Sequence, residues 1–397
     1  MIRHATGLLI IVLLSLVACS EGGPQAAATG VGGYAYRVPE ASDDGWSTVA
    51  LADVGMQAAP LEALMADVLN RDDHHLHAIL IVKDGKLVFE EYFSGHDADL
   101  TDYQFAPGPV RQFDRNTLHF LASASKSVTS LLLGIAIDRG FVRGVDDSML
   151  SYFPGYGYTA ASDEITLAHM LAMSTGLDWN EAGPYSSPSN LLNHLWHSPD
   201  PVRVVLEQRV VSAPGERFIY NSGTTNLLGE VVRRASGMPL REFAERYLFS
   251  PLGISDFEWV GFQHDPDMAL ASSALYLRPR DMAKIGQLML QEGTWQGQQV
   301  VSAEWVRASV RNAISLPSSM RRSFHTAGYG YQWWLESYNS GRIKAYSARG
   351  HGLQFIVVLP DVGLVVVFTG GAWGISPETA PVQYDHVIEK VILPSIL

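Results

Sequence analysis

The sequence predicts a mixed fold of the α/β (α+β) class, in which an antiparallel β-sheet formed from both termini is flanked by helices. Near the N-terminus, two apolar β-rich runs joined by a Lys-Asp-Gly-Lys turn predict a hairpin over residues 78–93. Near the C-terminus, four more such runs predict strands over residues 329–335, 344–348, 354–359 and 363–369. Between them, residues from about 145 to 262 have a mainly helical pattern interrupted by Pro and Gly, which predicts an inserted helical subdomain.

Helical periodicity predicts the individual helices around this sheet. In residues 123–139, Val128, Leu131 and Ile135 recur at helical spacing, and Gly140 follows where a C-terminal cap belongs. This segment is apolar nearly all round, so we expect it to be buried. Further helices are predicted over residues 61–70, 226–234, 282–292 and 382–393.

The composition narrows the classes of function. The chain has 397 residues, of which 47% are apolar, enough to bury a full core. Its 28 Lys and Arg residues stand against 41 Asp and Glu, and the net charge of −13 would repel a phosphate backbone. We therefore expect no nucleic-acid partner. The single cysteine excludes an internal disulfide framework and a multi-cysteine metal site.

The N-terminus has the pattern of an export signal. A short basic start precedes an apolar run from Gly7 to Ala18, which is shorter than the roughly 20 residues of a membrane-spanning helix. The run ends in Leu-Val-Ala-Cys, which resembles the bacterial lipobox, and this resemblance implies a signal peptide over residues 1–18 and a lipidated Cys19. The lipid would then hold the protein to the cell envelope, and Ser20 favours the periplasmic face of the outer membrane. An uncleaved anchor and a buried free thiol are the alternatives.

The segment after this cysteine is predicted to be a tether. Residues 21–33 are rich in Gly and Ala with few large side chains, which is typical of a flexible linker, and the lipidated cysteine and tether are assigned to residues 19–45. The folded domain is predicted to begin near Trp46 and to cover residues 46–397.

Neither a metal nor an organic cofactor is expected. The sequence has no His-Glu-x-x-His, no Walker loop, no dinucleotide-binding glycine motif and no Gly-x-Ser-x-Gly. His74, His75 and His77 precede a predicted strand without a carboxylate at a ligand spacing, so we interpret them as part of a solvated loop.

The strongest signal for chemistry is Ser123-Ala-Ser-Lys126 at the start of the apolar helix. Among the six lysines, only Lys126 has a serine three residues before it, and this spacing places both side chains on one helix face. A lysine amine can take the proton of a serine hydroxyl if burial lowers its pKa. The alternative is that Ser123 caps the helix and Lys126 extends along it to solvent.

A tyrosine about a hundred residues downstream fits the same chemistry. Tyr220 lies in the segment Arg-Phe-Ile-Tyr-Asn-Ser-Gly, directly before a predicted helix that would hold it in place. A phenol there could exchange a proton with Lys126 and pass it to a leaving group. A structural role for Tyr220 is the alternative.

Four other segments accompany these two in a fixed order: residues 171–179 (LAMSTGLDW), 280–286 (RDMAKIG), 329–334 (YGYQWW) and 350–354 (GHGLQ). Together they resemble the serine β-lactamase and penicillin-binding-protein superfamily, in particular its branch of class C-like (family VIII) esterases and 6-aminohexanoate-dimer hydrolases. The resemblance runs from about Trp46 to the C-terminus and implies a β-lactamase/transpeptidase-like fold. It also implies Ser123 as the acylated nucleophile, Lys126 as its base and Tyr220 as a proton shuttle.

The sequence departs from the superfamily at two motifs. Class C β-lactamases have Tyr-x-Asn where this chain has Tyr220-Asn221-Ser222, so Ser222 takes the third place with a shorter hydrogen-bonding group. Arg349-Gly-His351-Gly stands in place of Lys-Thr-Gly, whose lysine helps to hold the substrate carboxylate in β-lactamases. Efficient penicillin hydrolysis is therefore doubtful.

The remaining site candidates are assigned by position. The backbone amides of Ser123 and His351 are the candidates for an oxyanion hole. Asp178 is a candidate for substrate binding or for capping a turn, and Arg349 for attracting an acidic substrate or forming a salt bridge. Four aromatic residues are candidates for the wall of an apolar acyl pocket, or otherwise for the core: Trp179, Trp333, Trp334 and Tyr331.

These observations favour an envelope-anchored serine hydrolase that acts on ester or amide bonds of small substrates. The alternatives are a D,D-peptidase or β-lactamase and, from a different class, a non-catalytic sensor or binding module with the same fold. The sequence carries no signal for an oligomeric state.

Overall fold

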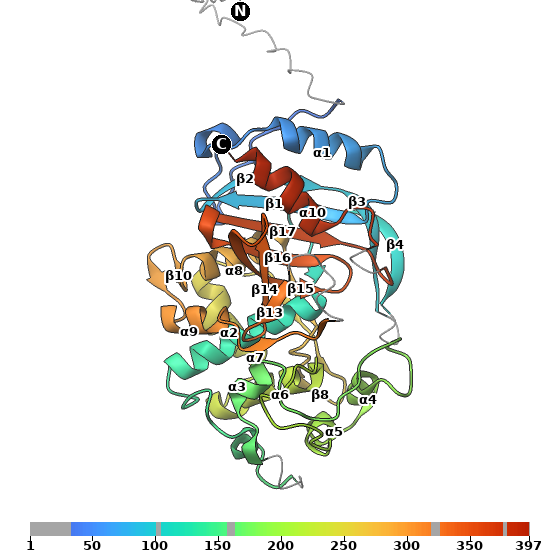
Figure 1. Cartoon of the computed structure of the whole chain (residues 1–397), viewed down its shortest axis with the longest axis vertical. Helices are drawn as coiled ribbons and strands as arrows, with labels where there is room; N and C mark the ends of the chain where they lie inside the picture. The colour runs from blue at the N-terminus through green and yellow to red at the C-terminus, as the bar shows by residue number, and fades with distance from the viewer. Residues whose placement is uncertain (1–32, 101–104, 157–162, 319–325, 376–378, 397) are drawn as a thin grey trace, which may run out of the picture.

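A central antiparallel sheet organises the molecule (Figure 1). The computed structural model describes residues 33–100, 105–156, 163–318, 326–375 and 379–396. Eight strands pair in the order β12-β13-β14-β15-β16-β17-β1-β2. Their bounds are β1 (Leu76–Lys83), β2 (Lys86–Tyr92), β12 (Ile314–Ser315), β13 (Thr326–Tyr329), β14 (Trp334–Tyr338), β15 (Ile343–Gly350), β16 (Gln354–Leu359) and β17 (Leu364–Gly370).

The two ends of the chain meet in this sheet. The N-terminal hairpin β1–β2 joins the C-terminal strand β17, with Ile79 opposite Phe368 in antiparallel register. The predicted sheet from both termini is thus confirmed. Smaller sheets contain β3 (Ser94–Asp99), β4 (Ala106–Gln112), β5 (His119–Phe120), β6 (Glu258–Trp259), β7 (Gly261–Phe262), β8 (Asp265–Ala269), β9 (Leu275–Leu277), β10 (Thr294–Trp295) and β11 (Gln298–Gln299).

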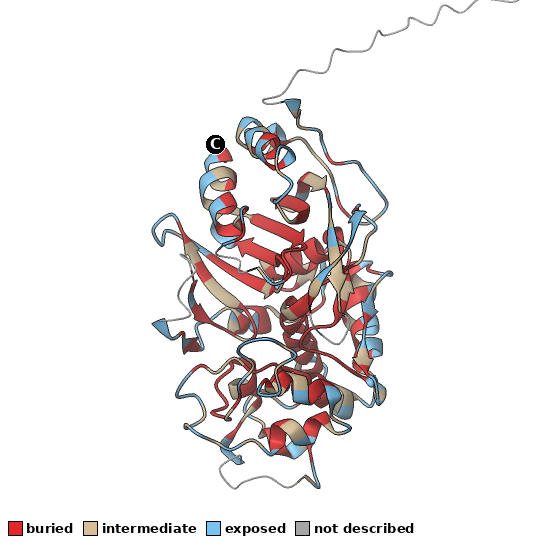
Figure 2. Cartoon of the chain, turned by 90° about the vertical axis from the view of Figure 1, so that its right-hand side faces the viewer, coloured by how far each residue is buried: buried red, intermediate tan, exposed pale blue. Residues whose placement is uncertain are grey.

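Helices cover both faces of the sheet, and the strands between them are buried (Figure 2). One face packs against α1 and the C-terminal helix, which comprises α10 and its helical continuation to residue 395, and the other against α8 and α2. The helical subdomain lies beyond α2 and includes α3 to α7. The α-helices are α1 (Ala59–Leu69), α2 (Ser125–Asp138), α3 (Leu167–Leu171), α4 (Leu191–His197), α5 (Pro201–Leu206), α6 (Ser222–Ser236), α7 (Leu240–Ala244), α8 (Pro279–Leu290), α9 (Ala303–Ser309) and α10 (Tyr384–Val387).

Two sequence predictions about element bounds are wrong. The apolar run 329–335 is not one strand, because β13 ends at Tyr329 and β14 begins at Trp334. Between them Gln332 has a φ of 64° and the Gly330 amide donates to the Trp333 carbonyl, which closes a turn.

The second wrong prediction concerns the end of the tether, because the last residues assigned to it pack on the folded domain. Tyr36 donates to the Val88 carbonyl, and the Arg280 guanidinium binds Asp44. The tether therefore cannot extend to residue 45, because aromatic and acidic side chains dock this segment. The predicted signal peptide and Cys19 lie outside the described residues. No helix in the described ranges is both long and apolar enough to cross a bilayer.

Candidate active site

Ser123 lies on a tight turn between a short strand and a buried helix. The Leu121 amide donates to the Leu275 carbonyl of β9, which fixes the chain just before the turn. Ala122 then has a φ of 46°, and Ala122–Ala124 form a 3₁₀ turn that leads into α2. The N-cap residue of α2 is Ala124, without a side-chain cap bond, so the interpretation of Ser123 as a helix cap is wrong. The half-buried Ser123 side chain is left available for chemistry.

Lys126 lies under this serine and is almost wholly buried. Its amine donates to the Ser123 hydroxyl oxygen and to the Ser272 carbonyl, both at 2.9 Å. The residue is only 2% exposed, so the alternative of a lysine extending to solvent is wrong. Burial lowers the pKa of the Lys126 amine to about 8, although Glu181 opposes this shift. A substantial neutral fraction at physiological pH can therefore accept a proton.

The Ser272 carbonyl is held in place from two sides. The Ser272 amide donates to the Asn226 side-chain oxygen at 3.0 Å, and the Thr129 hydroxyl donates to the neighbouring Ala271 carbonyl at 2.7 Å. These bonds tie the loop to α6 and α2. The Lys126 amine therefore has a second, fixed acceptor in the Ser272 carbonyl, in addition to the Ser123 hydroxyl.

Tyr220 approaches the pair from the helical subdomain. The Ile219 amide donates to the Met173 carbonyl, and Asn221 caps α6 by accepting from the Thr224 amide. The Tyr220 phenol interacts with the Ser123 side chain, and its ring centroid lies 5.0 Å from the Lys126 amine nitrogen. Burial raises the pKa of Tyr220 well above its usual value, so the phenol stays protonated and can donate. The fold thus brings Ser123, Lys126 and Tyr220 together.

One acidic residue of the site escaped the sequence analysis. Glu181 accepts from the Ser222 amide at 2.8 Å and from the Ser222 hydroxyl at 2.9 Å. It also accepts from the Trp179 indole at 2.7 Å. Ser222 is the first residue of α6, and both its amide and its hydroxyl are bound by Glu181. These two hydrogen bonds fix the start of α6. The signal that could have identified Glu181 is its place two residues after the 171–179 motif.

The end of strand β15 runs beside the serine turn. A Cβ added at Gly350 would lie 2.1 Å from the Leu121 carbonyl oxygen, so only glycine permits this approach. His351 follows directly. Its ring is half-buried and its Nε2 accepts from the Gly374 amide at 3.2 Å. The backbone of His351 therefore lies next to the nucleophile segment, as an oxyanion donor from this strand requires.

Other predicted site residues lie elsewhere. Trp333 is fully buried and packs edge-on against Tyr346, so it belongs to the core and does not face a substrate. Asp178 is half-buried and forms an ion pair with Arg209 at 2.9 Å, so its carboxylate, predicted to bind substrate or to cap a turn, is engaged with this guanidinium. Trp179 is buried and supports α6 through Glu181.

The Arg349 side chain is occupied by interactions with other side chains of the sheet. Its guanidinium forms an ion pair with Glu336 and donates to the Thr326 hydroxyl at 2.8 Å. The Glu336 side chain is wholly buried, so Arg349 neutralises a carboxylate of the sheet. Of the two roles predicted for Arg349, this arrangement fits the salt bridge and does not fit the attraction of an acidic substrate.

The interpretation of the histidine cluster as a loop needs one correction. His77 lies in β1, where it is 1% exposed and stacks on Phe113 with ring centroids 3.6 Å apart. Among the described residues, no group of three or more His, Cys, Asp or Glu side chains is arranged to hold a metal ion.

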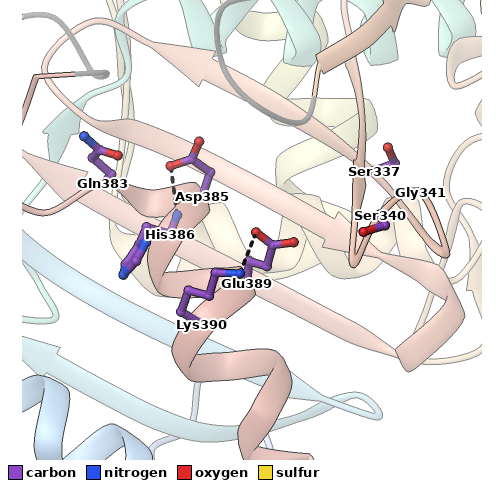
Figure 3. A pocket seen from close by; sticks show the side chains of 8 residues that line it. All are labelled: Ser337, Ser340, Gly341, Gln383, Asp385, His386, Glu389 and Lys390. Atoms are coloured by element: carbon purple, nitrogen blue, oxygen red, sulfur yellow. Dashed lines mark hydrogen bonds and ion pairs between the residues drawn. The ribbon is translucent and has the colours of Figure 1, made fainter.

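A polar hollow lies away from the Ser123 group (Figure 3). It has a volume of 690 Å³ and is formed by the β14–β15 turn and the C-terminal helix, with Glu389 and Lys390 paired at its edge. Strand β15 separates this turn from Gly350, and its eight residues span on the order of 25 Å. The hollow is therefore not part of the catalytic arrangement.

Comparison with known proteins identifies the family of this chain. The family model named Beta-lactamase matches residues 62–371. The chain belongs to the Beta-lactamase family. A curated relative, the 6-aminohexanoate-dimer hydrolase of Paenarthrobacter ureafaciens, is 25% identical over 291 residues, which cover 70% of this chain and 68% of that protein.

Solved structures with low sequence identity to this chain share the fold. A putative 6-aminohexanoate-dimer hydrolase from Bacillus anthracis superposes with a TM-score of 0.65 at 21% identity, covering 87% of this chain and 88% of that one. A family VIII carboxylesterase gives a TM-score of 0.60 at 16% identity, covering 80% and 92% respectively. The predicted superfamily and fold are thus confirmed, and the protein is a member of a hydrolase family.

Proposed function

We propose that this protein is a serine hydrolase that cleaves ester or amide bonds of small substrates through an acyl-enzyme on Ser123. The observation that carries the proposal is the contact of the Ser123 hydroxyl with both the buried Lys126 amine, at 2.9 Å, and the Tyr220 phenol. Acyl transfer requires a nucleophile that is hydrogen bonded to a base of lowered pKa and lies beside a protonated acid.

The proton movements follow from this arrangement. As the Ser123 oxygen bonds to the substrate carbonyl carbon, its proton passes to the neutral Lys126 amine. The Tyr220 phenol protonates the leaving alcohol or amine while the ester or amide bond breaks, and the Lys126 ammonium restores the phenol proton. A water molecule then attacks the acyl carbon while its proton passes to the neutral Lys126 amine. The bond from the acyl carbon to the Ser123 oxygen breaks, this proton returns to the Ser123 oxygen, and the acid leaves. The amides of Ser123 and His351 would hold the oxyanion.

The substrate class is argued from the residues beside the nucleophile. Ser222 and Arg349, which replace the superfamily's Asn and Lys, are engaged with Glu181 and Glu336 respectively. Ser222 is uncharged and the Arg349 guanidinium is paired with Glu336, so neither side chain offers a free cation to a penicillin carboxylate. Relatives named as a 6-aminohexanoate-dimer hydrolase and a carboxylesterase support an amidase or esterase ahead of a D,D-peptidase or β-lactamase.

A comparison of two chromogenic substrates tests this choice. We expect kcat/KM for p-nitrophenyl acetate to exceed that for a chromogenic cephalosporin by at least about 100-fold, and both activities to be lost in Ser123→Ala. Dominant cephalosporin turnover would overturn the esterase assignment. A correctly folded protein that hydrolyses neither substrate, nor a panel of small esters and amides, would favour the binding module.

We also propose that the protein is a lipoprotein of the bacterial envelope, held at the periplasmic face of a membrane by acylated Cys19. The lipobox-like sequence and the tether before Tyr34 support this. In a bacterial host, wild-type protein should sediment with membranes and Cys19→Ser should not. Membrane association that persists in Cys19→Ser would contradict the proposal.

A further inference from the structure

An apolar pocket of 160 Å³ lies among the segments that hold the serine turn. Aromatic rings form much of its wall: Phe105, Phe120, Trp196 and Tyr276. The side chains that line it carry three polar groups, the Tyr276 phenol, the Ser273 hydroxyl and the Trp196 indole N–H, and are otherwise hydrocarbon. Such a surface favours a hydrocarbon group over a charged one.

Two of the pocket's walls come from segments that also carry the proposed catalytic residues or hold them in place. Phe120 of β5 precedes Ser123 by three residues and lies opposite Tyr276 of β9 in the antiparallel pair. Ser273 follows Ser272, whose carbonyl accepts from the Lys126 amine. The pocket is therefore built from the same two segments that fix the nucleophile and its base.

Phe105, another residue of the pocket wall, lies close to His351, whose amide is a candidate oxyanion donor. The Phe105 ring lies 6.0 Å from the His351 ring and 5.9 Å from the Trp196 ring, centroid to centroid. A group bound among these rings would thus be near a carbonyl held between Ser123 and His351.

The leaving group has a different place. Tyr220, which would protonate it, packs with Phe218 and Trp334, and none of these three residues lines the pocket. The acyl part of the substrate is therefore the part left for the pocket.

We infer that this pocket binds the acyl chain of the substrate and selects apolar acyl groups of about six carbon atoms. An apolar cavity of about 150 Å³ is known to hold benzene, which sets the size. The inference rests on the proposed hydrolase function and specifies its substrate. It replaces the acyl wall predicted from Trp179, Trp333, Trp334 and Tyr331, since none of them lines the pocket.

A series of p-nitrophenyl esters tests the inference, because the leaving group stays constant while the acyl chain grows from acetate to dodecanoate. We expect kcat/KM to rise by about three- to fourfold per methylene up to hexanoate, as burial of each CH₂ predicts, and to fall beyond octanoate. A parallel series of acetate esters with longer alcohols should lack this optimum.

Variants of the wall connect the optimum to the pocket. Ala274→Val fills the pocket from a buried position and should lower the ratio of hexanoate to acetate kcat/KM by about tenfold. Val260→Phe narrows it from an exposed position and should act in the same direction, even if Ala274→Val fails to fold. The matched control Ala313→Val, on an exposed residue outside this pocket, should leave the ratio unchanged.

The outcomes separate the two proposals. Loss of all Ser123-dependent ester hydrolysis would overturn the proposed function itself. Hydrolysis of acetate that depends on Ser123, combined with a flat acyl series or an optimum in the alcohol series, would overturn the acyl pocket alone. An acyl optimum that neither wall variant shifts would also overturn it.

Discussion

At the scale of residues, the proposed chemistry depends on a lysine held close to its point of neutrality. Burial lowers the pKa of Lys126 to about 8, and the carboxylate of Glu181 limits that fall. A base must be neutral to accept the Ser123 proton, so kcat/KM should rise as the pH increases through about 8 and level off above it. Glu181 therefore has two roles: it fixes the start of α6, and it sets the pH at which the base becomes active.

Glu181→Gln tests the electrostatic role. The amide retains an oxygen for the Ser222 amide but removes the negative charge, so the pKa of Lys126 should fall and the acid limb of the kcat/KM profile should move to lower pH. The matched control is Asp178→Asn, since Asp178 is an acid of the same segment that pairs with Arg209 on the surface. A limb that stays in place or moves to higher pH in Glu181→Gln would refute the electrostatic role.

At the scale of elements, the turn before α2 and the end of β15 are fitted to each other at the backbone. Ala122 has a positive φ, which costs a non-glycine residue about 1–2 kcal/mol, and its surroundings must maintain it. The Leu121 carbonyl meets Gly350 with no room for a side chain. Two separate elements thus hold the nucleophile segment from either side.

Gly350→Ala should therefore impair catalysis. A Cβ 2.1 Å from the Leu121 oxygen must push the strand and the serine turn apart, and a shift of about 1 Å at the nucleophile can cost on the order of 100-fold in rate. Gly144→Ala is the control, because no atom lies within 4 Å of its added Cβ and its φ is not positive. Kinetics and melting temperatures should be measured together. Near-normal activity in Gly350→Ala would show that the contact is not needed.

The elements differed in how far the sequence could predict them. The hairpin β1–β2, the strands β15 to β17 and the helix α2 follow local patterns of turns and apolar spacing, and their predictions hold within a few residues. The prediction of one strand over residues 329–335 is wrong because the aromatic residues there favour a strand, whereas the backbone hydrogen bonds form a turn. The local pattern of apolar residues does not show that the backbone turns between Tyr329 and Trp334.

At the scale of the whole molecule, the sheet separates two cores, and the candidate site lies where the sheet meets the helical subdomain. The sequence could indicate Ser123, Lys126 and Tyr220 because each belongs to a motif. It could not select Glu181 over Asp178, since the direction of the two side chains depends on packing. The apolar pocket joins residues as distant as Phe105 and Leu270, so only the tertiary structure shows it.

The most direct test of the central claim is the site of covalent labelling by a fluorophosphonate probe, read by intact mass and peptide mapping. We predict one adduct per chain, on Ser123, and an unlabelled Ser123→Ala variant whose melting temperature is almost unchanged. An adduct on another residue, continued labelling of Ser123→Ala, or a folded wild-type protein that takes up no probe would contradict the claim.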